Sequence, residues 1–171
     1  MASVDVTGAS ISGNIFVSGA YLSAYDLGNH SLTAVNGVEK LEFGNTTLSS
    51  GISIQGANNT DIVFSTAGIF NISFSVQVTN NAVQENDFYL WLCFNGAPVA
   101  NTNSIVTVAP THGGIKGHNI AAWSFMVQTN IGDSYQLCWS GNDTDIAIET
   151  IASPAAGIPV SPAVILSVSQ V

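Results

Sequence analysis

The sequence predicts an all-β domain, an antiparallel sandwich or barrel, and two observations lead to this prediction. Apolar and polar residues alternate with a period of two along the chain, which is the spacing of strands with one buried face. Glycine, asparagine, aspartate and proline separate the alternating segments at short intervals, as they do at turns. Several short strands joined by such turns are typical of all-β sandwiches and barrels.

The clearest strand is expected at residues 69–78. Its apolar positions are Phe70, Ile72, Phe74, Val76 and Val78, and the positions between them are polar. The same pattern predicts strands at residues 61–64, 123–129, 134–139, 145–151 and 163–171. Turns are expected at Ala67-Gly68, Asn95-Gly96, Gly113-Gly114, residues 131–133 and 140–143, and in the proline-containing loop 153–162.

Residues 88–94 depart from this alternation because all seven are apolar. A strand of this kind is covered on both faces, so one face meets the core and the other needs a long loop or a neighbouring subunit. Large exposed apolar patches are rare on monomers, which favours the neighbouring subunit. The candidates for the subunit interface or the core are Tyr89, Trp91, Cys93, Phe94, Trp123 and Trp139. Tryptophans can also stack on sugars, but their alternating positions favour the core.

The composition excludes several classes of partner. Apolar residues make up 46% of the chain and charged residues 8%, against about a quarter charged in ordinary soluble domains. The net charge is −9, with two lysines and no arginine, so nucleic acid and anionic membranes are not expected partners. No apolar run approaches the roughly 18 residues of a membrane span, and residues 1–19 do not form a secretory signal.

Residues 1–17 differ from the rest and are expected to form an N-terminal attachment arm outside a domain spanning residues 18–171. The arm carries Asp5 as its one charged residue. Its aliphatic residues are Val4, Val6, Ile11, Ile15 and Val17, separated by small ones. This pattern suits an extended segment that adds to the edge of a partner's sheet, so these five are the candidates for attachment to that partner.

No catalytic, cofactor-binding or metal-binding site is expected. His112 and His118 are six residues apart, which matches no metal template. The acidic turn with Asp143 and Asp145 lacks the ligand series of a calcium loop. The carboxylates of Glu85, Asp87 and Glu149 could suggest a glycosidase, but the sequence fixes no cleft around them. The Gly-X-Ser-X-Gly motif of serine hydrolases does not occur.

Five segments occur in a characteristic order: Ser18-Gly-Ala-Tyr, residues 67–78, Leu90-Trp-Leu-Cys-Phe-Asn-Gly, Gly132-Asp-Ser-Tyr-Gln-Leu-Cys-Trp-Ser, and the closing residues 162–171. From the start of the first segment to the end of the last, they extend over about nine-tenths of the chain. In this order they resemble a jelly-roll domain of bacteriophage structural proteins, especially those of cyanophages. That domain is similar to the globular heads of complement subcomponent q and of tumour necrosis factor.

The resemblance implies a ten-strand, two-sheet antiparallel jelly roll, a homotrimer and a place on a phage particle, and it carries no catalytic residues. This sequence departs from the family pattern at Cys93 and Phe94, where phage relatives carry charged residues. In the family's fold the strands that bear Cys93 and Cys138 are neighbours in one sheet. These cysteines are expected to be close but not obligately bridged, because phage proteins assemble in a reducing cytoplasm.

The expected function is that of a non-enzymatic virion structural protein: a capsid decoration or cement protein, or a head-fibre trimer. It would assemble in the host cytoplasm and stand on the capsid surface, bound to the major capsid protein or to another virion protein. The alternative is the receptor-binding tip of a tail fibre. A glycan-cleaving tailspike is a third hypothesis, but it would need a longer body and a carboxylate-lined groove.

Overall fold

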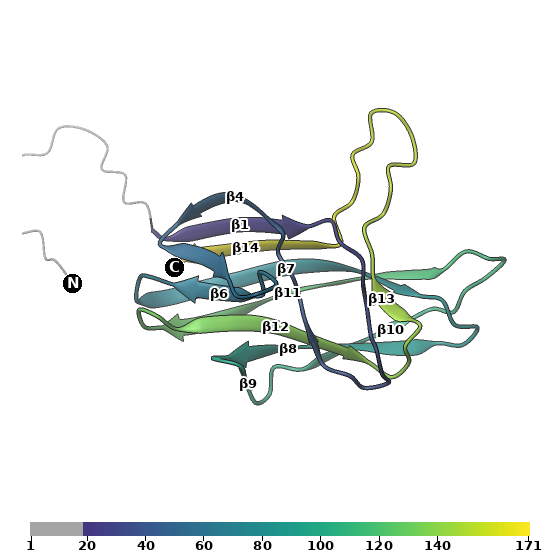
Figure 1. The fold of residues 1–171 in the computed structure, drawn as a ribbon, viewed down its shortest axis with the longest axis horizontal. Helices are drawn as coiled ribbons and strands as arrows, with labels where there is room; N and C mark the ends of the chain where they lie inside the picture. The colour runs from purple at the N-terminus through teal and green to yellow at the C-terminus, as the bar shows by residue number, and fades with distance from the viewer. Residues whose placement is uncertain (1–18) are drawn as a thin grey trace, which may run out of the picture.

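The structure, a computed structural model, describes residues 19–171 (Figure 1). The five attachment candidates, Val4, Val6, Ile11, Ile15 and Val17, lie outside the described residues. The described part of the chain contains fourteen strands and no helix, so the all-β prediction is confirmed. A helix long and apolar enough to cross a membrane is accordingly not found in this part of the chain.

Ten of the fourteen strands are four residues or longer, and they form the body of the jelly roll. They are β1 (Tyr21–Asp26), β4 (Asn45–Ser50), β5 (Ile52–Gln55), β6 (Asp61–Phe64), β7 (Gly68–Asn80), β8 (Asn86–Phe94), β10 (Ser104–Val108), β11 (Gly117–Thr129), β12 (Ser134–Gly141) and β14 (Val164–Gln170). The short strands are β2 (His30–Ser31), β3 (Glu39–Lys40), β9 (Ala97–Pro98) and β13 (Ile146–Ile148).

The strands form two seven-stranded antiparallel sheets. We name as sheet A the one with the order β2-β13-β7-β14-β1-β4, in which β11 also pairs with β7. Sheet B has the order β10-β8-β12-β6-β5, with β3 beside β12 and β9 beside β8. The chain crosses from sheet A to sheet B between β4 and β5 at Gly51, whose φ of 70° is a backbone conformation that glycine adopts readily.

The central strand of sheet A is β7. It pairs with β11 over its whole length, and with β14 and β13 on its other side. Its five alternating apolar side chains are all buried, and the polar residues between Phe70 and Val78 point the other way. The strand predicted at residues 69–78 is therefore confirmed, with one further residue at its start and two at its end.

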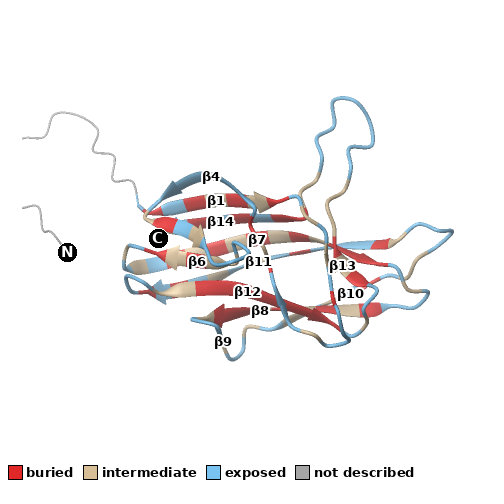
Figure 2. Ribbon diagram, viewed as in Figure 1, coloured by how far each residue is buried: buried red, intermediate tan, exposed pale blue. Residues whose placement is uncertain are grey.

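The core lies between the inner faces of the two sheets (Figure 2). Sheet B contributes Phe88, Leu90 and Leu92 from β8, and Leu137 and Trp139 from β12. The ring of Phe88 stacks on that of Trp139 with 5.7 Å between centroids. The rings of Phe64 in sheet B and Phe70 in sheet A meet edge-to-face at 4.7 Å, which joins the two layers.

The other predicted strands are present with altered bounds. Residues 61–64 form β6 as expected. The predicted strand 134–139 is extended by two residues in β12, and the predicted strand 163–171 is shortened by one residue at each end in β14. The strand expected at 145–151 is shortened to β13, because the chain turns outward toward the loop at 153–160. The Asn95-Gly96 turn is confirmed: both residues have positive φ, at 47° and 84°, as a two-residue hairpin turn of type I′ requires.

The two cysteines, expected to be close but not obligately bridged, are neighbours as expected, and in this structure they form a disulfide. Strand β8 pairs with β12 so that Gln136 lies opposite Cys93, which places Cys138 diagonally across on the same face. Their Cα atoms are 6.3 Å apart, within the roughly 4–7 Å that disulfides span, and the sulfurs are bonded. The bond fixes the register of the two strands on the outer face of sheet B.

The two faces of β8 should respond differently to truncation. The substitution Phe88→Ala removes a fully buried ring from the core and should lower the free energy of unfolding by about 3–5 kcal/mol. The substitution Trp91→Ala removes a half-buried ring from the outer face and should cost less than half as much. Urea denaturation of the two variants measures the difference, and equal losses would contradict the assignment of the faces.

Candidate binding surfaces

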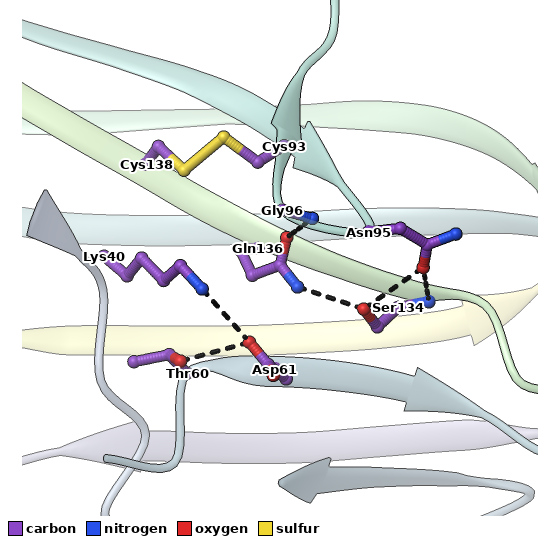
Figure 3. A network of polar contacts seen from close by, with 9 residues as sticks. All are labelled: Lys40, Thr60, Asp61, Cys93, Asn95, Gly96, Ser134, Gln136 and Cys138. Carbon is purple, nitrogen blue, oxygen red and sulfur yellow. Dashed lines mark hydrogen bonds and ion pairs between the residues drawn. A yellow bond between two sulfur atoms is a disulfide. The ribbon is translucent and has the colours of Figure 1, made fainter. Parts of the chain in front are cut away.

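The outer face of sheet B is held by polar contacts around the disulfide (Figure 3). The Lys40 ammonium lies 3.6 Å from the Asp61 carboxylate, which connects β3 to β6. The Gln136 amide donates to Ser134 Oγ at 3.0 Å and accepts the backbone N–H of Gly96 at 3.1 Å. These contacts occupy the polar groups of this region and fix the Asn95-Gly96 turn against β12.

A hollow of about 410 Å³ lies farther along the same face, beside Tyr89 and Trp91. Both rings are half-buried and point outward from β8, since Phe88 and Leu90 point inward. The remaining lining residues are Asn36, Val38, Pro98, Val99, Asn101, Asn103 and Ser140. None of the residues that line this hollow carries a charge.

Ser140 also lines this hollow and lies opposite Tyr89 in the pairing of β12 with β8. The residue is 5% exposed, and its Oγ has no hydrogen-bond partner among the described residues. Buried hydroxyls are usually hydrogen-bonded, so this oxygen is an unusual feature of the fold. No sequence pattern indicates this unpaired hydroxyl, because Ser140 and Tyr89 are far apart in the sequence and come together only through the pairing of β12 with β8.

The structure separates the six residues expected at the core or the interface. Trp139 is fully buried in the core, and Cys93 is buried in the disulfide. Phe94 packs beside the ring of Tyr135, with 5.0 Å between centroids. Trp123 is half-buried on β11 and meets the ring of Phe74 edge-to-face at 4.9 Å. Tyr89 and Trp91 together line the uncharged hollow on the outer face of sheet B.

The outer face of sheet A is uncharged over four adjacent strands, β1, β14, β7 and β11. Alternation directs outward Tyr21, Ser23, Tyr25, Ile165, Ser167, Ser169, Ile69, Asn71, Ser73, Ser75, Gln77, His118, Ile120, Ala122, Ser124, Met126 and Gln128. This set contains no aspartate, glutamate, lysine or arginine, although the chain has eleven acidic residues. The exposed apolar members include Ile120 at 57% and Met126 at 62%.

The strand register arranges small residues in rows across this face. One row is made of four serines, Ser23, Ser167, Ser73 and Ser124, one from each strand. The next row is Tyr25, Ile165, Ser75 and Ala122. The short side chains of the serine row, together with Ser75 and Ala122, make this part of the sheet flat, which allows another flat surface to approach closely.

The Asp26 carboxylate forms a polar cluster at the end of β1. It accepts hydrogen bonds from the backbone N–H groups of Gly28 at 2.7 Å and Gly44 at 3.1 Å, and lies 2.8 Å from His30 Nε2. Burial is the largest single effect and raises the pKa of Asp26. The hydrogen bonds from His30, Gly28 and Gly44 together outweigh it, so the pKa lies below its ordinary value of 3.8.

The other titratable residues considered in the sequence are dispersed. His112 lies in a short turn bridged to Ile115, whereas His118 is exposed on β11. Glu149 forms an ion pair with Lys116, and Asp87 accepts a hydrogen bond from Thr107 Oγ1 at 2.7 Å. No group of three or more metal-ligating side chains gathers anywhere in residues 19–171.

Comparison with known proteins supports the fold. No family model and no curated protein matches the chain. Among solved structures, murine APRIL, a jelly-roll protein of the tumour necrosis factor family, has a similar fold, with a TM-score of 0.56 and 12% sequence identity. The match covers 90% of this chain and 100% of that one. The chain therefore has the jelly-roll fold of tumour necrosis factor, and a fold alone does not fix a function.

The Asp26 cluster predicts a pH dependence of stability. Folding lowers the pKa of the Asp26 carboxyl, so this group stabilises the fold fully at pH values above its pKa in the unfolded chain. The contribution is lost as the pH falls through the pKa of the carboxyl in the folded state. The substitution Asp26→Asn should therefore cost about 1–2 kcal/mol near neutral pH. The difference between wild type and variant should shrink below pH 3.8, as measured by urea denaturation. A difference that does not change with pH would contradict this account.

Proposed function

We propose that this chain is a non-enzymatic structural protein of a phage virion, and that it works as a homotrimer whose subunits meet through the outer face of sheet A. The observation that carries the proposal is the absence of charge from that face in a chain with a net charge of −9. Copies of so acidic a chain repel one another unless they meet where no charge is present. A neutral face with exposed aliphatic side chains supplies such a place.

Sheet A is a stronger interface candidate than residues 88–94. On the outer face of β8, the chain's own Val38, Pro98 and Val99 already stand around Tyr89 and Trp91. On sheet A the uncharged face extends across four strands, and Ile120, Met126 and Ile165 are exposed on it. Burying this apolar surface between copies would stabilise an oligomer. The number of three subunits rests on the resemblance to phage jelly-roll domains.

The proposed place on a phage particle also rests on the resemblance to phage jelly-roll domains. The five sequence segments are the basis of that resemblance, and the jelly-roll fold is consistent with it. We propose that residues 1–17 attach the trimer to the major capsid protein or to another virion protein, so that the protein decorates or cements the capsid. Three arms on one trimer bind together, so each single contact can be weak. The alternative is that the same trimer forms the receptor-binding tip of a tail fibre.

A charge placed at the centre of sheet A should dissociate the trimer. Ser167 is exposed in the single chain, so Ser167→Glu should fold normally but place like charges together between subunits. We expect its trimer dissociation constant to rise about a hundredfold. Light scattering should give three times the 17.7 kDa chain for wild type and smaller species for the variant. The control, Ser53→Glu on sheet B, should stay trimeric; a monomeric wild type would refute the proposal.

Deletion of residues 2 to 15 tests attachment separately. The truncated protein should still fold, melt at the wild-type temperature and form trimers, because its jelly roll is intact. It should no longer co-sediment with capsids that bind the full-length protein. If the truncated chain decorates capsids as well as the full-length chain, attachment belongs to the jelly roll. If it fails to fold, the arm is part of the core.

A further inference from the structure

We propose that the hollow beside Tyr89 and Trp91 binds a neutral sugar residue within a polysaccharide chain. The inference goes beyond the proposed structural role and does not depend on it. The hollow lies on the outer face of sheet B, whereas the proposed subunit interface lies on sheet A. Its volume of about 410 Å³ falls within the roughly 300–1,000 Å³ of small-molecule sites.

The aromatic residues supply the surface on which a sugar ring would stack. Tyr89 and Trp91 are two residues apart on one strand, so both rings project from the same face of β8. The face of an aromatic ring carries partial negative charge, which attracts the weakly positive C–H groups of a pyranose. Val38, Pro98 and Val99 extend the apolar side of the hollow.

The polar residues of the hollow match the hydroxyl groups of a sugar. The Ser140 hydroxyl both donates and accepts hydrogen bonds, and it lacks a partner in the described chain. The side-chain amides of Asn36, Asn101 and Asn103, which are exposed around the hollow, likewise supply donors and acceptors. A ligand with several neutral hydroxyls can satisfy these groups, and it would give Ser140 Oγ the partner that a buried hydroxyl requires.

The absence of charge from the lining selects the class of ligand. A carboxylate, sulfate or phosphate would lose hydration on entering this hollow without meeting a cation, which is unfavourable. The negative net charge of the chain also repels anions. The hollow is open to solvent and bordered by the exposed residues Asn101 and Asn103, so a sugar bound in it can be part of a longer chain.

The test titrates the full-length protein with the methyl glycosides of glucose, galactose and mannose and with linear tetrasaccharides of the same sugars, followed by ligand-observed NMR. At least one of these saccharides should bind the wild type, and methyl glucuronide should bind no better than its neutral counterpart. Removal of the stacking surface in Trp91→Ala should weaken binding about tenfold or more. Removal of one hydroxyl in Ser140→Ala should weaken it about fivefold.

Matched variants keep the test informative. Asn103→Ala should weaken binding, whereas Asn58→Ala, another exposed asparagine outside the hollow, should not. Ser53→Ala is the corresponding control for Ser140→Ala. If Trp91→Ala does not fold, the Ser140 and Asn103 variants carry the test.

The proposal is overturned if no saccharide of the panel binds, or if binding is unchanged in the Trp91, Ser140 and Asn103 variants. It is also overturned if Trp91→Ala lowers the mass measured by light scattering, because the hollow would then be covered by a second copy of the chain. Failure of the sheet A interface would appear in Ser167→Glu instead, so the two proposals can fail separately.

Discussion

The alternation along β7 is the constraint on which the rest of the structure depends. Phe70, Ile72, Phe74, Val76 and Val78 are buried at 5% exposure or less, and they form the centre of the apolar layer that sheet B covers. A shift of one residue in the register would turn these five side chains to the outside. The pairing of β7 with β11 on one side and with β14 and β13 on the other therefore fixes both faces of sheet A at once.

The same alternation creates the outer surface from which function is inferred. Because the buried positions of β7 are apolar, Ser73 and Ser75 project outward, and the register aligns Ser73 with Ser167 and Ser124. The acidic residues of the described chain lie away from this face, at strand ends, in loops and on sheet B. The outer faces of the two sheets consequently differ in chemistry. The outer face of sheet A is neutral, with small side chains along its middle and exposed aliphatic side chains around them, whereas sheet B carries the disulfide, an ion pair and an aromatic hollow.

The sequence predicted those elements in which alternation coincides with burial on one face, such as β6, β7 and β14. It missed β4, because all six of its residues are exposed and no buried position marks the period. It also missed β10, an edge strand of sheet B on which Ile105 is 59% exposed. The disulfide and the hollow could not be predicted from spacing, since both depend on the register of β8 with β12. That register brings Cys138 near Cys93, and Ser140 beside Tyr89, across separations of about fifty residues.

The most direct test of the central claim measures distances between subunits. If the trimer closes through sheet A, a spin label attached at Ser167→Cys lies in the subunit interface, so pulsed electron resonance should find a short distance between labels. A label at Ser53→Cys, on the outer face of sheet B, should give distances that are longer by the thickness of the subunits. Short distances at Ser167 and long distances at Ser53 would support this interface. Labels at Ser167 that show no coupling, or short distances at Ser53 instead, would contradict it.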